Sequence, residues 1–154
     1  MKLKEQEFLM EVALLAAKRS EAQRLRVGAV VADISGNIIA TGFNGTVKNF
    51  PNDGGEYKEY CAPYTHEDEY GHYKIVTDQD MMVHAEQNVI AHAARRGISI
   101  NGGTIIGTHS PCMKCCSLLI QCGITEMIFN EKHHSFDKVE DTYGKYIILK
   151  HWNH

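Results

Sequence analysis

The chain has 154 residues, of which 44% are hydrophobic and 23% charged, so it can form one globular domain with a substantial core but not two. Its 16 basic and 19 acidic side chains give a net charge of −3, which argues against a nucleic-acid polymer held by its phosphates. No apolar run approaches the ~20 residues of a membrane span, and the N-terminus lacks the apolar stretch of a secretory signal. We therefore expect a cytoplasmic protein without a membrane partner.

The first half of the chain predicts a helix, a hairpin and a long loop. Apolar residues at helical spacing predict an amphipathic helix over residues 3–19. Residues 27–32 and 38–43 are typical of two strands joined by a tight turn at 33–37. Residues 44–80 show no period, and we expect a functional loop there because a compact domain seldom keeps so long a loop otherwise.

The second half alternates helices and strands: a helix over 83–96, a strand over 104–108, a helix over 110–122, a strand over 126–130 and, after a short helix, a strand over 146–149. Gly97 and Gly123 follow the two longer helices at the usual C-terminal position. Ser110 is the expected N-cap of the second, with Pro111 in its first turn. This order predicts a single α/β domain over residues 1–154, a three-layer α-β-α sandwich around a mixed sheet of about five strands.

Three of the five cysteines, Cys112, Cys115 and Cys116, lie within five positions. A disulfide framework would spread its cysteines along a secreted chain, so this grouping favours metal binding or redox chemistry. We expect Cys116 and Cys122 to be core thiols on their helix.

Cys112 and Cys115 are three residues apart at a predicted helix start, so both sulfur atoms can reach one ion. The helix N-terminus favours the thiolates that zinc requires. A redox dithiol and half of a structural zinc site are the alternatives, but the sequence contains no second Cys-x-x-Cys pair. With His84 as third ligand, the fourth position stays open for water, as in catalytic zinc sites.

His84 and Glu86 are two residues apart, about 200° around a helix, so they cannot both bind zinc from the middle of one. In the first turn of a helix both can point at the site, His84 as ligand and Glu86 as proton carrier between the zinc-bound water and the substrate. His-x-Glu followed by Pro-Cys-x-x-Cys is the sequence mark of zinc base deaminases. The alternative is a structural zinc site on an inactive scaffold.

The chain resembles the deoxycytidylate (dCMP) deaminase family, with its cytidine deaminase-like fold, over roughly residues 5–135. The matching segments are residues 26–31, 39–46, 84–90, 110–115 and 118–124. The family pattern Gly-Tyr-Asn-Gly occurs as Gly42, Phe43, Asn44 and Gly45, with Phe in place of Tyr as a mild substitution. This element separates the family from tRNA adenosine and guanine deaminases more than the zinc motif does.

The resemblance implies hydrolysis of dCMP to dUMP and ammonia, feeding thymidylate synthesis. It implies substrate-binding residues at Arg26, Asn44, Ala85 and Ser110. It also implies a regulatory site at Gly42, Phe43, Asn44 and Gly45, where dCTP activates and dTTP inhibits, each with Mg2+, between subunits of a homo-hexamer. From the residues alone, Gly42 and Gly45 can take positive φ and let a ligand approach, and a tight turn without a ligand is the alternative.

A monophosphate substrate needs positive charge, for which Arg24 and Arg26 are the first candidates. Lys114 and the pair His133 and His134 are less favoured.

The sequence also departs from the family. Many relatives have a cysteine for a second, structural zinc where this chain has Ala22. Cys61, His66 and His72 could still bind one, but a polar loop with one buried thiol is the favoured interpretation. Family residues cannot be transferred to the tail from residue 136.

Two rival functions stay open. One is a deaminase of another cytosine or adenine substrate, such as free cytidine or an RNA base. The other is a catalytically silent nucleotide-binding regulator, which would not need Glu86.

Overall fold

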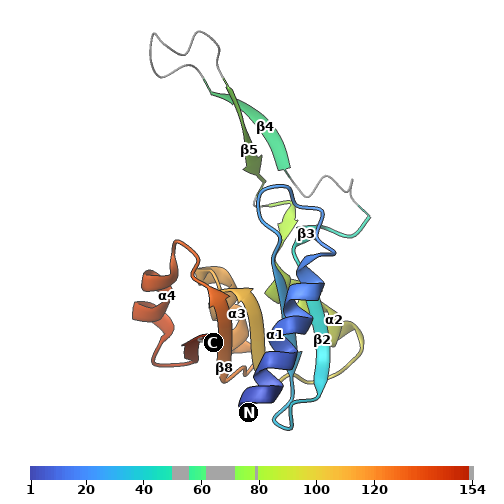
Figure 1. Ribbon diagram of the computed structural model, residues 1–154, viewed down its shortest axis with the longest axis vertical. Coiled ribbons are helices and arrows are strands. Elements are labelled where there is room, and N and C mark those ends of the chain that lie inside the picture. Colours follow the sequence, from blue (N-terminus) through green and yellow to red (C-terminus); the bar gives the residue numbers. More distant parts are fainter. Residues whose placement is uncertain (50–55, 62–71, 79, 153–154) are drawn as a thin grey trace.

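Five of the strands form one central sheet in the order β2-β1-β7-β8-β9 (Figure 1). The structure, a computed structural model, describes residues 1–49, 56–61, 72–78 and 80–152. The strands are β1 (Gly28–Ala32), β2 (Ile38–Phe43), β7 (Thr104–His109), β8 (Glu126–Glu131) and β9 (Ile148–His151). β1 pairs antiparallel with β2 and β7, whereas β8 runs parallel to β7 and β9. The expected mixed five-stranded sheet is confirmed.

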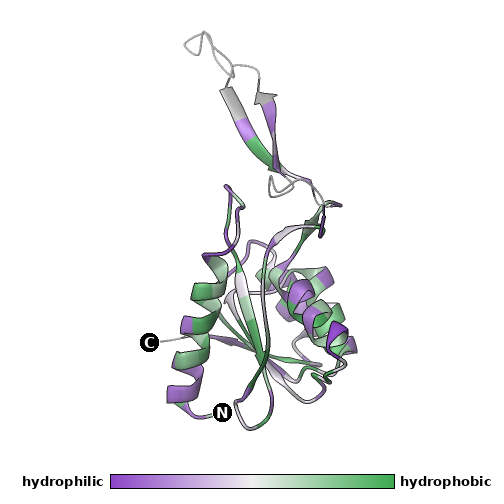
Figure 2. Cartoon of the chain, turned by 90° about the vertical axis from the view of Figure 1, so that its right-hand side faces the viewer, coloured by the Kyte–Doolittle hydropathy of each residue, from purple (hydrophilic) through white to green (hydrophobic). Residues whose placement is uncertain are grey.

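Helices cover both faces of this sheet: α1 (Leu3–Ala17), α2 (Ala85–Arg95), α3 (Met113–Gln121) and α4 (Phe136–Tyr143). Alternate strand residues point to opposite faces, because successive side chains of a strand do. Val30 and Ile106 pack with α1, and Val31 and Ile105 pack with α2, α3 and α4. Figure 2 shows α1 on one side of the sheet and the other helices opposite. The expected three-layer α-β-α sandwich is confirmed.

The helix ends follow the sequence signals in part. Gly97 and Gly123 have φ of 64° and 79° just after α2 and α3, as expected of C-terminal glycines. Within the described part of the chain, no helix combines the length and the hydropathy that a membrane crossing requires.

The expected N-cap Ser110 is wrong, because the N-cap of α3 is Cys112. The amide of Ser110 donates to the carbonyl of Glu131, so the chain stays paired with the end of β8 and turns into the helix later. The last strand, expected over residues 146–149, lies two residues further along the chain, at Ile148–His151. The amide of Ile147 donates to the carbonyl of Tyr143, so this part of the chain still closes the end of α4.

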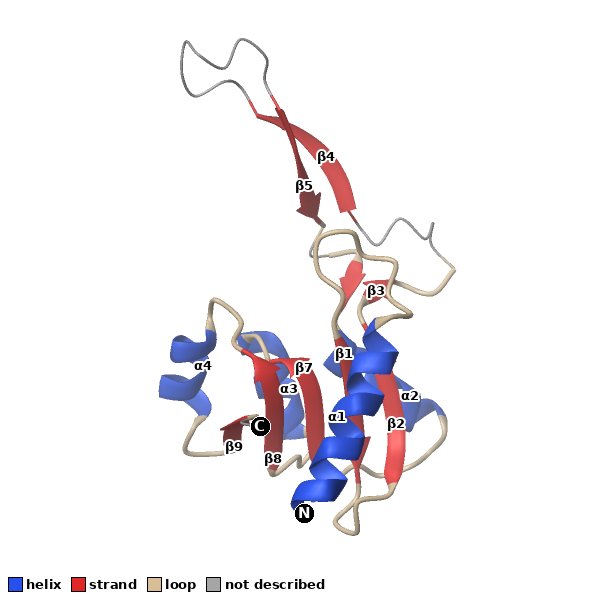
Figure 3. Ribbon diagram, viewed as in Figure 1, coloured by secondary structure: helices blue, strands red, loops and turns tan. Residues whose placement is uncertain are grey.

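Residues 44–80, expected to form a long functional loop, contain three short strands among the residues that the structure describes. β4 (Glu56–Cys61) and β5 (His72–Thr77) form an antiparallel ribbon that projects away from the central sheet (Figure 3). At its base β3 (Gly45–Thr46) pairs with β6 (Met82–Val83). Charged side chains interrupt the apolar pattern of both long strands and pair across the ribbon, with Lys74 Nζ 2.9 Å from Glu59 Oε2. Among the ribbon residues whose exposure the structure describes, 56–59 and 74–77, none is fully buried, so alternation between a buried and an exposed face does not mark these strands in the sequence.

Candidate metal centre

The N-termini of α2 and α3 converge at one point. His84 precedes α2 with φ −73° and ψ 158°, and Cys112 precedes α3 with φ −78° and ψ 171°. Both are therefore N-cap residues with extended backbone, whose side chains can turn back over the first helical turn. The amide of Cys115 donates to Cys112 Sγ at 3.5 Å, and Gln87 Oε1 accepts from the amide of His84 at 2.8 Å.

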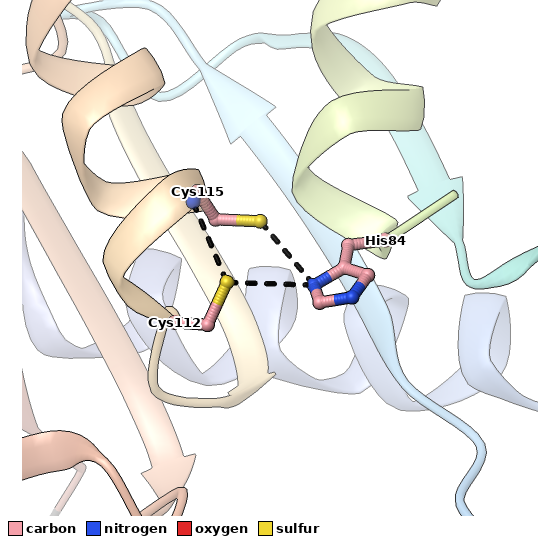
Figure 4. Close-up of side chains that lie close together, drawn as sticks. All are labelled: His84, Cys112 and Cys115. Carbon is pink, nitrogen blue, oxygen red and sulfur yellow. Dashed lines mark hydrogen bonds between the residues drawn. The ribbon is translucent and has the colours of Figure 1, made fainter. Parts of the chain in front are cut away.

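The three expected ligand atoms form a small triangle (Figure 4). His84 Nδ1 lies 3.6 Å from Cys112 Sγ and 3.4 Å from Cys115 Sγ, and all three atoms lie within 4.8 Å of one another. Zn–S bonds of about 2.3 Å and Zn–N bonds of about 2.1 Å at a tetrahedral angle separate N from S by about 3.6 Å. The triangle fits zinc, and three protein ligands leave one tetrahedral position for another molecule.

Glu86 lies in the first turn of α2 and is only 4% exposed. Burial raises the pKa of its carboxyl, and a hydrogen-bonding contact with Cys115 and the nearby His84 oppose part of that rise. A buried carboxyl with a raised pKa, next to metal ligands, is suited to accept a proton and to return it. The structure therefore brings together His84, Glu86, Cys112 and Cys115, as the two motifs predicted.

The contact between the two cysteine side chains shifts their pKa values in opposite directions. The hydrogen bond from Cys115 is the main cause that lowers the pKa of Cys112 to about 3, with His84 and the amide of Cys115 adding to it against burial. The same hydrogen bond and burial raise the pKa of Cys115, and contact with Cys112 raises that of His84.

Gly42 of β2 fixes the position of the α2 N-terminus. A Cβ here would collide with the carbonyl oxygen of Ala85 and lie 2.7 Å from the amide nitrogen of Val89. Asn88 reinforces the contact by donating from Nδ2 to the carbonyl of Phe43 at 2.7 Å. The expected positive φ at Gly42 and Gly45 is wrong: neither is among the positive-φ glycines, and a Cβ at Gly45 would meet nothing within 4 Å.

The side chain of Asn44 is hydrogen-bonded to the backbone of the segment just before β1. It is buried, its Nδ2 donates to the carbonyl of Leu25, and its Oδ1 accepts from the amide of Val27, both at 2.8 Å. Ser20 Oγ donates to its carbonyl at 2.8 Å. Sequence reasoning missed Ser20 and Asn88, although Asn88, four residues after His84, lies on the same side of the helix as that ligand.

Two of the other three expected substrate-binding residues are neighbours of the metal ligands in the sequence, and the third is not. Ala85 and Ser110 are buried beside the ligands His84 and Cys112. Arg26 is exposed, and its Nε donates to the carbonyl of Ala22 at 3.4 Å, so its side chain lies over its own loop.

Two of the remaining cysteines belong to the core around α3, whereas the side chains considered for a second zinc site are not described by the structure. Cys116 is a core thiol and Cys122 is half-buried against the same core, as expected. His66 lies outside the described residues, as do the side chains of Cys61 and His72.

This combination of sheet, helix N-termini and metal centre is that of the zinc-dependent base deaminases. The chain belongs to the family described as "Cytidine and deoxycytidylate deaminase zinc-binding region", whose model matches residues 3–131.

Its relatives include several dCMP deaminases. It is 30% identical to human deoxycytidylate deaminase over 133 residues, 86% of this chain and 68% of the human one. It is 31% identical to a probable deoxycytidylate deaminase of Drosophila melanogaster over 80% of this chain and 57% of that one. It is 33% identical to ComE operon protein 2 of Bacillus subtilis, over 82% and 59%. The chain thus spans less than two thirds of the Drosophila and Bacillus proteins.

Solved structures with a similar fold cover nearly the whole chain. The dCMP deaminase of cyanophage S-TIM5, in complex with dCMP and dUMP, has a TM-score of 0.77 at 26% identity and 99% coverage of both chains. A tRNA:A34 deaminase at 18% identity, with a TM-score of 0.61 and 96% and 99% coverage, shares the fold.

Proposed function

We propose that this protein catalyses the hydrolytic deamination of dCMP to dUMP and ammonia, supplying dUMP for dTMP synthesis. The observation that carries the proposal is the metal-binding triangle of His84, Cys112 and Cys115 with the buried Glu86 beside it. The named activity of the relatives and the ligands of the cyanophage enzyme support dCMP as substrate.

A zinc ion held by the three ligands would lower the pKa of a water molecule and polarise it for attack. Glu86 accepts a proton from the attacking water and donates one to the ring nitrogen next to the amino-bearing carbon. A C–O bond forms at that carbon while its C=N π bond to the ring nitrogen opens. Glu86 then takes the remaining proton from the added hydroxyl and delivers it to the amino group, so that the C–N bond breaks, ammonia leaves and the C=O bond of dUMP forms. The raised pKa of Glu86 suits a group that must be protonated and deprotonated in turn.

Four residues are proposed to hold the substrate: Arg26, Asn44, Ala85 and Ser110. Ala85 and Ser110 are supported by their places next to His84 and Cys112, and Arg26 and Asn44 by the family resemblance. Asn44 has one Nδ2 hydrogen left for a sugar hydroxyl after its bond to Leu25.

Regulation and assembly are further parts of the proposal. We expect dCTP with Mg2+ to activate and dTTP with Mg2+ to inhibit at Gly42, Phe43, Asn44 and Gly45, between subunits of a hexamer. The support is the resemblance of this segment to the family pattern. A single domain over residues 1–154, a functional role for residues 44–80 and a cytoplasmic location also stay predictions.

The test is an assay of the zinc-loaded protein with dCMP, CMP, deoxycytidine and dCTP, following the loss of cytosine absorbance. We expect dCMP to be the preferred substrate. Turnover of deoxycytidine but not of dCMP would overturn the substrate assignment. Indifference to dCTP and dTTP would remove the regulatory site, and light scattering that shows a monomer would remove the hexamer.

A further inference from the structure

The end of β7 separates from β1 just before the metal-binding loop, residues 110–112. The antiparallel ladder of β1 and β7 ends at Gly107, whereas the parallel ladder of β7 and β8 continues to His109. A continued first ladder would pair Gly28 with Thr108 through their backbones. Instead, the amide of Gly28 donates to Thr108 Oγ1 at 3.1 Å. A side-chain hydroxyl thus takes the place of the backbone acceptor, and the last two residues of β7 follow β8 alone.

The hydroxyl of Thr108 begins a chain of hydrogen bonds that runs through His109 to Glu131. His109 Nδ1 lies 3.0 Å from Thr108 Oγ1, and Nε2 lies 3.3 Å from Glu131 Oε2. A carboxylate only accepts, so the hydrogen of the neutral ring is on Nε2, and Nδ1 is an acceptor. The hydroxyl of Thr108 therefore donates to Nδ1 while it accepts from the amide of Gly28. The chain links β1, β7 and β8 where the metal-binding loop begins.

The chain is shielded from water at its Thr108 end. Thr108 is 3% exposed and the side chain of His109 14%, whereas the side chain of Glu131, at 66%, reaches the solvent. A buried donor or acceptor that loses its partner costs about 1–3 kcal/mol, because water cannot replace the bond. Thr108 therefore satisfies the amide of Gly28 and orients the ring of His109 at a place where solvent does neither.

Little conformational freedom remains between this chain of hydrogen bonds and the ligand Cys112. The amide of Ser110 donates to the carbonyl of Glu131 at 2.8 Å, and both Ser110 and Pro111 are buried. Proline holds its own φ near about −65°, so Pro111 adds no rotation about that bond. The direction in which β7 ends therefore decides where the sulfur atom of Cys112 lies.

We propose that Thr108 is a positioning residue of the metal centre. Its hydroxyl, bonded to Gly28 on one side and to His109 on the other, fixes the direction in which the chain leaves β7 and thereby the place of Cys112. Thr108 acts through the metal-binding loop and not as a ligand. The inference rests on the proposed function, because the ion held by Cys112 is taken to be the zinc of the reaction.

The experiment measures the zinc dissociation constant, by competition with a chromogenic chelator, and the Tm of wild type, T108V and T108S. Valine has the shape of threonine without its hydroxyl, whereas serine keeps the hydroxyl. We expect T108V to bind zinc about 10-fold more weakly or worse, since changing residues that orient metal ligands costs about 10- to 100-fold in affinity. T108S should recover most of this loss.

The matched control is T104V, at the opposite end of the same strand. Thr104 Oγ1 donates to Glu126 Oε2 at 3.4 Å, so it also links β7 to β8 through a side chain, but far along the strand from the metal-binding loop. T104V should therefore lower the Tm at most and leave the zinc dissociation constant unchanged.

An unchanged zinc dissociation constant in T108V, with or without a lower Tm, would refute the positioning role, and so would a T108S variant that binds zinc as weakly as T108V. Should T108V fail to fold, H109F takes its place, because it leaves the amide of Gly28 its partner. H109Q, which keeps an N–H for Glu131, is then the variant expected to recover zinc binding. Failure of the proposed function has a different signature, namely that the wild type converts no dCMP, and the zinc affinities still decide the inference in that case.

Discussion

Replacing Gly42 by alanine should damage the metal centre from a distance. The Cβ would collide with the carbonyl of Ala85 and lie 2.7 Å from the amide nitrogen of Val89, against the 3.4 Å at which ordinary contacts begin. Both contacts are with backbone, which no side-chain rotation can relieve. The start of α2 must therefore move away from β2 by about 0.7 Å or more. His84 and Glu86, on either side of Ala85, move with it.

The magnitude follows from this displacement. Overpacking costs about 1–3 kcal/mol, and each kcal/mol lowers the Tm of a domain of this size by about 2–4 °C. A catalytic group misplaced by about 1 Å can cost 10²-fold in rate, so we expect kcat/KM to fall by 10- to 100-fold, with weaker zinc binding.

The matched control is G45A, three residues along the chain, where a Cβ meets nothing within 4 Å. Its stability should stay within about 0.5 kcal/mol of the wild type. The assays are thermal unfolding, zinc competition with a chromogenic chelator, and turnover. If G42A matches G45A in both Tm and zinc affinity, Gly42 does not position the helix.

Three further predictions concern single side chains. E86Q should keep its zinc, measured by atomic emission, and lose at least about 10²-fold in turnover; full activity would exclude Glu86 as the proton carrier. In metal-free protein at about pH 6, iodoacetamide should modify Cys112, whose pKa is lowered to about 3, before Cys116, whose pKa burial raises to about 12. Mass spectrometry of the modified peptides checks this order, and added zinc should slow the first reaction. The pKa of Asp33 is lowered below 3.8, mainly by hydrogen bonds from Asn37, so its stabilising effect exists above that pH and disappears as pH falls through the folded pKa. The difference in urea midpoint between wild type and D33N should therefore shrink between about pH 5 and pH 2, and a constant difference would contradict it.

The motifs predicted the metal centre well because its parts are local in sequence. His84 with Glu86, and Cys112 with Cys115, each lie in a helix start that the sequence marks. The inner strands β1, β7 and β8 were also found, because their apolar runs are buried on both faces. The family resemblance then agreed with the comparisons over residues 3–131.

The misplaced features depend on contacts between distant segments. Ser110 has the residue type of an N-cap, yet pairing with Glu131 keeps the chain extended past it. Gly42 was expected to give backbone freedom, whereas the structure uses its small size against Ala85, from a helix that begins 43 residues later. The described side chains of the β4–β5 ribbon, at 56–59 and 74–77, are not fully buried, so they give the sequence no clear period. None of these contacts has a signature within one segment of the sequence.

The position of His84 and Cys112 at helix N-caps has a consequence for evolution. The three metal ligands and Glu86 lie between the end of β6 and the first turn of α3, and the family model ends with β8, at residue 131. His133, α4 and β9 follow that limit, and the β4–β5 ribbon projects away from the sheet. Sequence changes in the ribbon can therefore accumulate without moving the metal ligands, which lie in the layers of the sandwich.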